Sequence, residues 1–226
     1  MVRTENVRKV YHAGETDVNA LQGVSLNIDK GDFVSIAGPS GSGKTTLLNL
    51  IGCIDTVTEG EIYIDDQPVS GKDKKELALL RRKRIGFVFQ NFNLIPVLTA
   101  YENVSFALSL LKLSDKEVKE RTMEILREVG LEGMEDRLPS RLSGGQQQRV
   151  AVARALVKEP DLILADEPTA NLDSKTGQDI LDLMEQLNEK YNATFIFSTH
   201  DQMVMDFAHR LVMLHDGKIS SDERRK

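Results

Sequence analysis

The stretch Gly38-Pro39-Ser40-Gly41-Ser42-Gly43-Lys44-Thr45-Thr46 has the spacing of a phosphate-binding loop, in which a glycine, four residues and a second glycine precede a lysine and a threonine. A short apolar run, residues 33–37, comes before it, and a run compatible with a helix, residues 46–51, comes after it. Strand, glycine-rich loop and helix is the order that such a loop requires. The alternative is a glycine-rich turn that binds nothing.

The residue types of this loop suit a nucleotide. Glycines let backbone N–H groups turn inward toward phosphate oxygens, and the start of the following helix adds the positive end of its dipole. We expect Lys44 to reach the β- and γ-phosphates and the Thr45 hydroxyl to ligate Mg²⁺. The predicted cofactor-binding residues of the loop are Gly38, Ser40, Gly41, Ser42, Gly43, Lys44, Thr45 and Thr46.

Composition narrows the class of protein. The 226 residues suffice for one large α/β domain, and 40% apolar content is ordinary for a packed core. The formal net charge of −6 argues against a nucleic-acid-binding protein, which usually carries a basic surplus. The single cysteine excludes an internal disulfide, and the histidines lack the spacing of a zinc site. No run approaches the roughly 18 apolar residues of a membrane span, so we expect no direct membrane insertion.

Three apolar runs end in polar residues, as expected of buried parallel strands whose carboxyl ends face a ligand. Beside a phosphate-binding loop, Asp166 would complete a Mg²⁺ shell and Glu167 would polarise an attacking water. The alternative for the two carboxylates is an acidic turn, and a lone histidine is more often structural. The runs and their ends are residues 85–89 with Gln90, residues 162–165 with Asp166 and Glu167, and residues 194–198 with Thr199 and His200.

The apolar stretch from Phe92 to Tyr101 is interrupted by Pro96 and lacks a regular period, and it either packs under a helix or forms a partner-binding patch. Residues 100–158 then change to helical character and contain no good strand. They close with Leu142-Ser143-Gly144-Gly145-Gln146, ahead of a helix predicted over residues 146–157. Ser143 fits a helix cap, but two successive glycines at a helix start favour the close approach of a phosphate.

The pattern predicts an α/β fold with a mostly parallel sheet in a single domain over residues 1–226. Residues 1–30 and 60–65 alternate like half-buried strands, which we expect to form an antiparallel β subdomain. Tyr11 is the aromatic residue there that would stack on adenine, and packing in an edge strand is the alternative. Residues 211–219 predict a terminal hairpin, after which the polar tail to Lys226 is expected to fray.

Together and in this order, the motifs resemble those of the ATP-binding subunit of an ABC transporter, over essentially residues 1–222. Within the family, the sequence resembles the macrolide-exporter and lipoprotein-release class. This closer resemblance lies in the stretches from Gly86 to Pro96 and from Leu98 to Val104, and in the three glutamines after Gly145. The resemblance implies a P-loop NTPase core with the β subdomain (residues 1–91 and 159–226) and an inserted α-helical subdomain with the signature motif (residues 92–158). Asn171 departs slightly from the family pattern, because many relatives carry a small residue there.

The resemblance implies an ATPase that uses ATP and Mg²⁺. Tyr11 would stack on adenine, Glu167 would act as general base, and His200 would hold the γ-phosphate and the attacking water. Gln90 would sense the γ-phosphate. Gln90, Thr45 and Asp166 would ligate Mg²⁺, and Lys44 would bind the phosphates. A second set would act on the nucleotide of a second copy, so that a homodimer sandwiches two ATP molecules. That set is Ser143, Gly145 and Asp173, and the neighbouring Gly144 and Gln146 complete the predicted cofactor-binding residues.

The resemblance also implies a membrane partner. In the family, the groove beside the stretch from Phe92 to Tyr101 receives a coupling helix of the permease subunit, so we expect a cytoplasmic subunit held peripherally at the inner face of the cell membrane. It would power lipoprotein release or macrolide or peptide export. Rival hypotheses are a mechanotransmission ATPase that moves no substrate, such as a cell-division cassette, and a soluble kinase or DNA-repair ATPase. A kinase would not need Ser143 to Gln146, and the interval from Gly38 to Ser143 is too short for the coiled coil of a repair ATPase.

Overall fold

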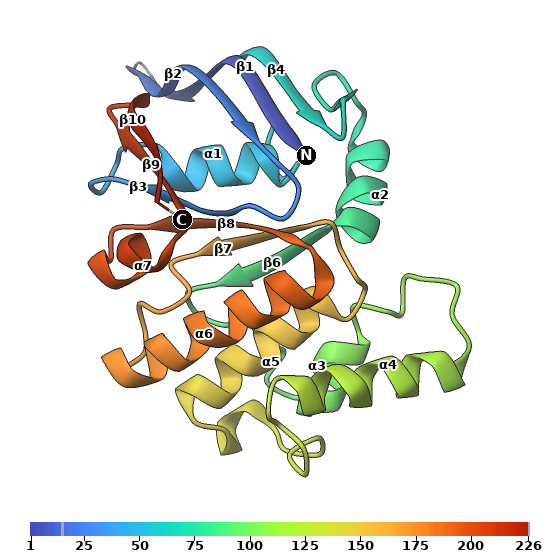
Figure 1. Cartoon of the computed structure of the whole chain (residues 1–226). Helices are drawn as coiled ribbons and strands as arrows, with labels where there is room; N and C mark the ends of the chain where they lie inside the picture. Colours follow the sequence, from blue (N-terminus) through green and yellow to red (C-terminus); the bar gives the residue numbers. More distant parts are fainter. Residues whose placement is uncertain (15, 226) are drawn as a thin grey trace. The chain divides into compact units, whose positions relative to one another are not determined.

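The computed structural model describes residues 1–14 and 16–225, which divide into two compact units. Unit 1 consists of Met1–Arg81 and Thr194–Lys226, and unit 2 consists of Arg82–Ala193. The chain is drawn in Figure 1, where each unit contains both strands and helices. Each unit is therefore of α/β type, as the sequence predicts.

Unit 1 holds an antiparallel sheet in the order β2-β1-β4-β5. From Leu21 onward, strand β2 buries every second residue, except where a β-bulge interrupts the alternation. One face of the strand is therefore apolar and buried, and the other is exposed to solvent. This sheet confirms the antiparallel β subdomain predicted from alternation. The strands are β1 (Val2–Ala13), β2 (Thr16–Ile28), β4 (Glu59–Ile64) and β5 (Gln67–Pro68).

A second group of strands in unit 1 carries the phosphate-binding loop. Strands β8 and β9 flank β3 in parallel, and β10 pairs antiparallel with β9. All of β3 and β8 is buried, with Phe33 stacked on Phe195 at a centroid distance of 5.6 Å. The bounds are β3 (Phe33–Ala37), α1 (Lys44–Ile51), α2 (Lys74–Arg84), β8 (Thr194–Thr199), α7 (Gln202–Phe207), β9 (Arg210–His215) and β10 (Lys218–Arg224).

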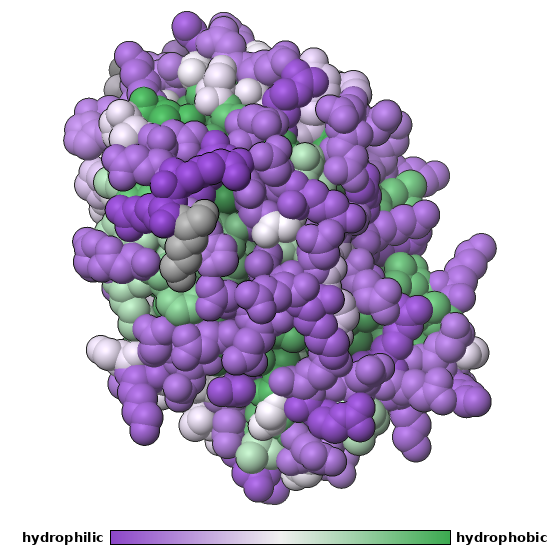
Figure 2. Space-filling view, in the orientation of Figure 1, coloured by the Kyte–Doolittle hydropathy of each residue, from purple (hydrophilic) through white to green (hydrophobic). Residues whose placement is uncertain are grey.

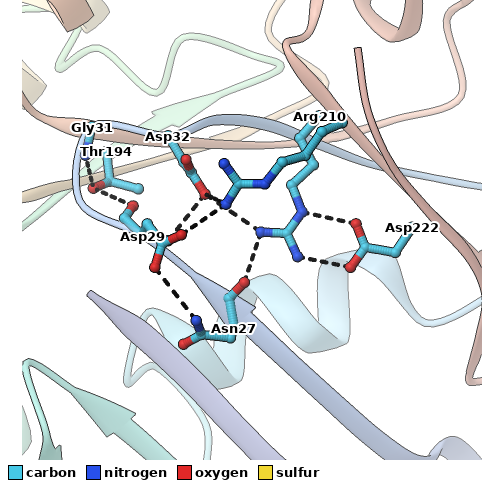
Figure 3. Close-up of polar contacts among 8 residues, drawn as sticks. Asn27, Asp29, Gly31, Asp32, Thr194, Arg210 and Asp222 are labelled. Atoms are coloured by element: carbon cyan, nitrogen blue, oxygen red, sulfur yellow. Dashed lines mark hydrogen bonds and ion pairs between the residues drawn. The ribbon is translucent and has the colours of Figure 1, made fainter. Parts of the chain in front are cut away.

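The polar tail is ordered, so the prediction that it frays is wrong for the described residues; Lys226 lies outside them. Two nitrogens of Arg210 donate to the two carboxylate oxygens of Asp222 at 2.8 and 2.7 Å, and a third donates to the Asn27 carbonyl at 2.7 Å (Figure 3). Arg224 pairs with Asp29 at 2.7 Å. This ion cluster fastens β10 to the turn that precedes β3, because charge-assisted bidentate pairs are among the strongest hydrogen bonds.

Unit 2 contains two parallel strands, β6 (Ile85–Phe89) and β7 (Leu162–Asp166). Helix α5 packs so closely on β6 that a Cβ at Gly86 would lie 2.6 Å from the Ala155 carbonyl. Residues 92–158, all of which the structure describes, contain helices and no strand, which agrees with the helical character predicted for residues 100–158 (Figure 1). The helices of unit 2 are α3 (Ala100–Ser105), α4 (Asp115–Glu128), the 3-10 turn η1 (Pro139–Arg141), α5 (Gly144–Leu156) and α6 (Ser174–Tyr191).

The surface shown in Figure 2 is mostly hydrophilic, with apolar residues in small patches. Within residues 1–14 and 16–225, no helix has both the length and the apolar character that crossing a bilayer demands.

Candidate functional site

The predicted phosphate-binding loop leads from β3 into α1, and two of its glycines, Gly38 and Gly43, are sterically required. Gly38 has a φ of 155°, and a Cβ there would lie 2.0 Å from the Leu214 carbonyl. Gly43 has a φ of 101°, and a Cβ there would lie 2.5 Å from the Ala20 carbonyl. The backbone can therefore follow this path only without side chains at these two positions.

Lys44 turns back over the loop. Its Nζ donates to the carbonyls of Gly38 at 2.8 Å and Pro39 at 3.0 Å, and the residue is only 7% exposed. No side chain among the described residues caps the start of α1 at Gly43. A buried ammonium beside an uncapped helix start is a fitting environment for a phosphate chain.

Tyr11 belongs to a hydrogen-bond network in unit 1 that the sequence did not reveal. Its hydroxyl donates to one Asp55 carboxylate oxygen at 2.8 Å, and Lys9 Nζ donates to the other at 2.8 Å. Burial raises the pKa of Tyr11, and the bond to Asp55 raises it further. Burial acts to raise the pKa of Asp55 as well, but the hydrogen bonds from Lys9, the Thr56 backbone and Tyr11 outweigh it and lower that pKa. Tyr11 is nevertheless 38% exposed, so part of its ring remains accessible.

His200 directly follows β8, as predicted. The register of the parallel pair places Ala37 of β3 beside Thr199 of β8, so Gly38 and His200 leave the same edge of the sheet. His200 is exposed, and the next residue, Asp201, caps α7 by accepting from the Met203 backbone at 2.9 Å. Unit 1 thus brings the phosphate-binding loop and His200 to one edge.

Unit 2 gathers its own set of predicted residues. Phe89 of β6 lies opposite Asp166 of β7, so Gln90 and Glu167 both lie just past this edge. The Asn171 amide donates to the Gln90 carbonyl at 3.0 Å and to the Asn91 side-chain oxygen at 2.9 Å. One side chain therefore ties the turn after β6 to the turn after β7.

Helix α5 begins at Gly144, two residues before its predicted start. Ser143 and Gln146 form a capping box, in which the Ser143 hydroxyl accepts from the Gln146 backbone at 3.3 Å and the Gln146 side chain accepts from the Ser143 backbone at 3.0 Å. These reciprocal bonds offset the poor helix propensity of the two glycines. Ser143 is thus a helix cap, the alternative that its sequence context allowed.

Gly145 and Asp173 each have a local structural role as well. A Cβ at Gly145 would lie 2.5 Å from the Thr176 methyl group. Asp173 caps α6, accepting from the Thr176 hydroxyl at 2.6 Å and from its backbone N–H at 3.1 Å, and these bonds lower the Asp173 pKa. The two segments predicted to face a second copy therefore contact each other through Thr176.

The apolar stretch from Phe92 to Tyr101 is a fixed loop. The side chain of Asn103, 1% exposed, donates to the carbonyls of Ile95 at 3.1 Å and Leu98 at 2.9 Å and accepts from the Ile95 backbone at 2.8 Å. Arg154 fastens the start of the loop by donating to the Phe92 carbonyl at 2.8 Å. Val97 remains 77% exposed on this rigid support.

The donor set for a metal is sparse. No group of three or more His, Cys, Asp or Glu side chains positioned to hold a metal ion occurs in the part of the chain that the structure describes. Mg²⁺ usually takes one or two protein ligands and completes its shell with water and substrate phosphates. The Thr45 hydroxyl in unit 1 and the Asp166 carboxylate in unit 2 are each an oxygen ligand of the kind that such a shell takes.

A family profile described as ABC transporter matches residues 21–170. The chain belongs to the ABC transporter family. It is 50% identical, over 99% of its length and 97% of the relative, to the uncharacterized ABC transporter ATP-binding protein MJ0796 of Methanocaldococcus jannaschii. It is 47% identical to the macrolide export ATP-binding/permease protein MacB of Syntrophobacter fumaroxidans, and the match covers 98% of this chain and 31% of that protein.

Solved structures agree with the family and the fold. A dimeric post-hydrolysis state of MJ0796 bound to ADP and Pi matches with a TM-score of 0.91 and 50% identity, covering 100% of this chain and 99% of that one. The cassette CbiO1 of Clostridium perfringens, part of the transporter complex CbiONQ, matches with a TM-score of 0.91 at 31% identity, covering 100% and 88%. The fold is therefore that of an ABC ATP-binding cassette, and the relatives named MacB support the predicted macrolide-exporter class.

Proposed function

We propose that this chain binds and hydrolyses ATP to power a membrane complex of the macrolide-export or lipoprotein-release type. The phosphate-binding loop supports this proposal most. Gly38 and Gly43 let its backbone pass close to the carbonyls of Leu214 and Ala20, and Lys44 lies buried beside the start of α1. That environment suits the phosphates of a nucleotide, and the homologous cassette carries ADP and Pi.

The proposed chemistry is phosphoryl transfer to water, driven by positioning and charge. Lys44 and the loop backbone hold the β- and γ-phosphates, and Tyr11 stacks on the adenine. Glu167 orients and deprotonates the attacking water, and His200 supports the γ-phosphate. Thr45, Gln90 and Asp166 would hold Mg²⁺, which would supply positive charge that stabilises the phosphates.

We further propose that two copies form the working unit, as in the dimeric structure of MJ0796. The start of α5 and the cap of α6 would then act on the partner copy's nucleotide. The residues concerned are Ser143, Gly145 and Asp173.

The proposed permease contact is the loop from Phe92 to Tyr101, because its exposed Val97 stands on a rigid support built by Asn103 and Arg154. Through that contact the subunit would act peripherally at the inner face of the cell membrane. Co-purification in mild detergent, followed by mass spectrometry, tests this part. An integral membrane protein with a large extracytoplasmic domain is expected, and a soluble partner would contradict it.

Two substitutions test the ATPase. Glu167→Gln should keep ATP affinity, lower turnover by about a hundredfold or more and trap an ATP-dependent dimer on a sizing column. Lys44→Ala should lose ATP binding in calorimetry. Full turnover in Glu167→Gln, or unchanged affinity in Lys44→Ala, would refute the proposed mechanism.

A further inference from the structure

The backbone at Glu167 is strained. Glu167 has a φ of 47°, in the left-handed region that residues with a Cβ seldom adopt, and Pro168 follows it. A residue before proline is normally restricted to extended conformations, because the proline ring collides with it in helical ones. Such a conformation persists only where the surroundings impose it, so neighbouring groups must hold Glu167 and Pro168.

Gln148 of α5 is in contact with this turn. Its Nε2 donates to the Pro168 carbonyl at 2.6 Å, and both residues are buried, with Gln148 at 0% exposure. The bond fixes the peptide unit directly after Pro168, one residue beyond Glu167. The Glu167 carbonyl, in turn, accepts from the Ala170 backbone at 3.2 Å, which closes the turn from the other side.

The second polar atom of Gln148 indicates that stability alone does not explain this residue. Its Oε1 is buried and has no hydrogen-bond partner among residues 1–14 and 16–225. An unpaired buried acceptor is unfavourable. A methionine of similar shape would remove this acceptor but leave the Pro168 carbonyl without its donor, so each residue leaves one buried acceptor unpaired, and stability gives no clear preference for glutamine. Polar groups that cost stability in this way are expected at functional sites.

We propose that Gln148 is a positioning residue that sets the backbone of Glu167 from helix α5. This inference rests on the proposed role of Glu167 as general base. Gln148 lies about one turn into the helix that begins with Gly144 and Gly145. When the start of α5 engages the nucleotide of a second copy, the same rigid helix adjusts the Pro168 carbonyl and, with it, the Glu167 carboxylate. Hydrolysis thereby depends on closure of the dimer.

Gln148→Met tests the inference, with Gln147→Met as a matched control. Gln147 is the adjacent glutamine on α5, and its Nε2 donates to the Leu142 carbonyl at 3.1 Å instead of to the catalytic turn. In the full chain, Gln148→Met should lower kcat about tenfold and change the KM for ATP less than about twofold. The Tm should change little, because the substitution removes the unpaired Oε1 but leaves the Pro168 carbonyl without its donor. Gln147→Met should keep kcat within about twofold. If Gln148→Met fails to fold, Gln148→Asn, whose amide is too short to reach the carbonyl, takes its place.

A double variant separates positioning from general damage. In a Glu167→Gln background, Gln148→Met should leave the residual rate unchanged, because there is no carboxylate left to position. Hydrogen exchange should also rise in residues 166–171 for Gln148→Met and not for Gln147→Met. A kcat within twofold of wild type, an equal loss in the Glu167→Gln background, or unchanged exchange would overturn the inference. If Glu167→Gln itself keeps full turnover, the proposed function fails instead.

Discussion

At the scale of single residues, Tyr11 is the proposed platform for adenine, and its contacts hold the ring in place. Its hydroxyl bond to Asp55 fixes the ring, and Lys9, 8% exposed, holds Asp55 from the other side. Tyr11→Phe removes only that bond, so ATP affinity should fall about fivefold, the value of one ordinary hydrogen bond. Affinity for inorganic triphosphate should not change, because this ligand has no adenine.

Calorimetric titration of ATP and triphosphate measures this difference, and Tyr63→Phe is the control because its ring lies under Arg3 instead. Equal weakening of both ligands by Tyr11→Phe would mean that the hydroxyl supports the fold and not the adenine platform.

Asn171 links the turns after β6 and β7, and we expect its loss to affect turnover more than stability. Its amide joins the Gln90 carbonyl to the turn that carries Glu167 and Asp173, and its side chain is exposed, so its removal should cost the fold less than about 1 kcal/mol. Asn171→Ala should lower kcat about threefold to tenfold by loosening both turns, with the ATP affinity retained. Steady-state turnover and thermal melting measure the two effects. A large loss of Tm with unchanged kcat at lower temperature would assign Asn171 to stability alone.

At the scale of elements, the sequence predicted what is encoded locally. Glycine spacing and apolar runs located the loop from Gly38 to Thr46 and the polar strand ends, because each signal lies within one short segment. The start of α5 was placed too late, since the capping box of Ser143 overrides the propensity of the glycines. The Lys9–Asp55 pair joins segments far apart in the chain, and no local pattern reveals such a contact.

The ion pair between Asp222 and Arg210 holds strand β10 against β9. Asp222 has a pKa below its ordinary value, first because Arg210 donates to its carboxylate. A lowered carboxyl pKa in the folded state contributes stability above the unfolded pKa of about 3.9, and that stability is lost as pH falls through the folded value. Asp222→Asn should therefore destabilise the chain at pH 7 by about 1 kcal/mol, a small value because Asp222 is partly exposed.

Urea unfolding at pH 7 and at pH 3 measures this effect. The difference in unfolding free energy between wild type and Asp222→Asn should narrow at pH 3. This pH lies below the unfolded pKa of about 3.9, so the stability from the ion pair is already being lost toward the lowered pKa of the folded state. Glu223→Gln, one residue along the same strand and on its opposite face, is the control and should change little at either pH. A gap that is equal at both pH values would rule out the ion pair as its source.

At the scale of the whole molecule, the proposed sandwich makes each nucleotide site depend on two copies. Lys44→Ala damages the phosphate-binding loop, and Ser143→Arg damages the segment expected to act on the partner copy's nucleotide. Each variant should be inactive alone. In a mixed dimer, however, the intact loop of the Ser143→Arg chain meets the intact α5 start of the Lys44→Ala chain, and one complete site results.

Mixing equal amounts of the two variants should therefore restore turnover, up to about a quarter of wild type, because random pairing makes half of the dimers mixed and each of these has one complete site. A chain that carries both substitutions, mixed with Lys44→Ala, is the control and should restore nothing. Ser143→Arg also removes a helix cap worth about 1 kcal/mol, so its Tm must be checked before mixing. If two folded variants regain no activity at concentrations where wild type dimerises, the site is complete within one copy and the sandwich is excluded for this chain.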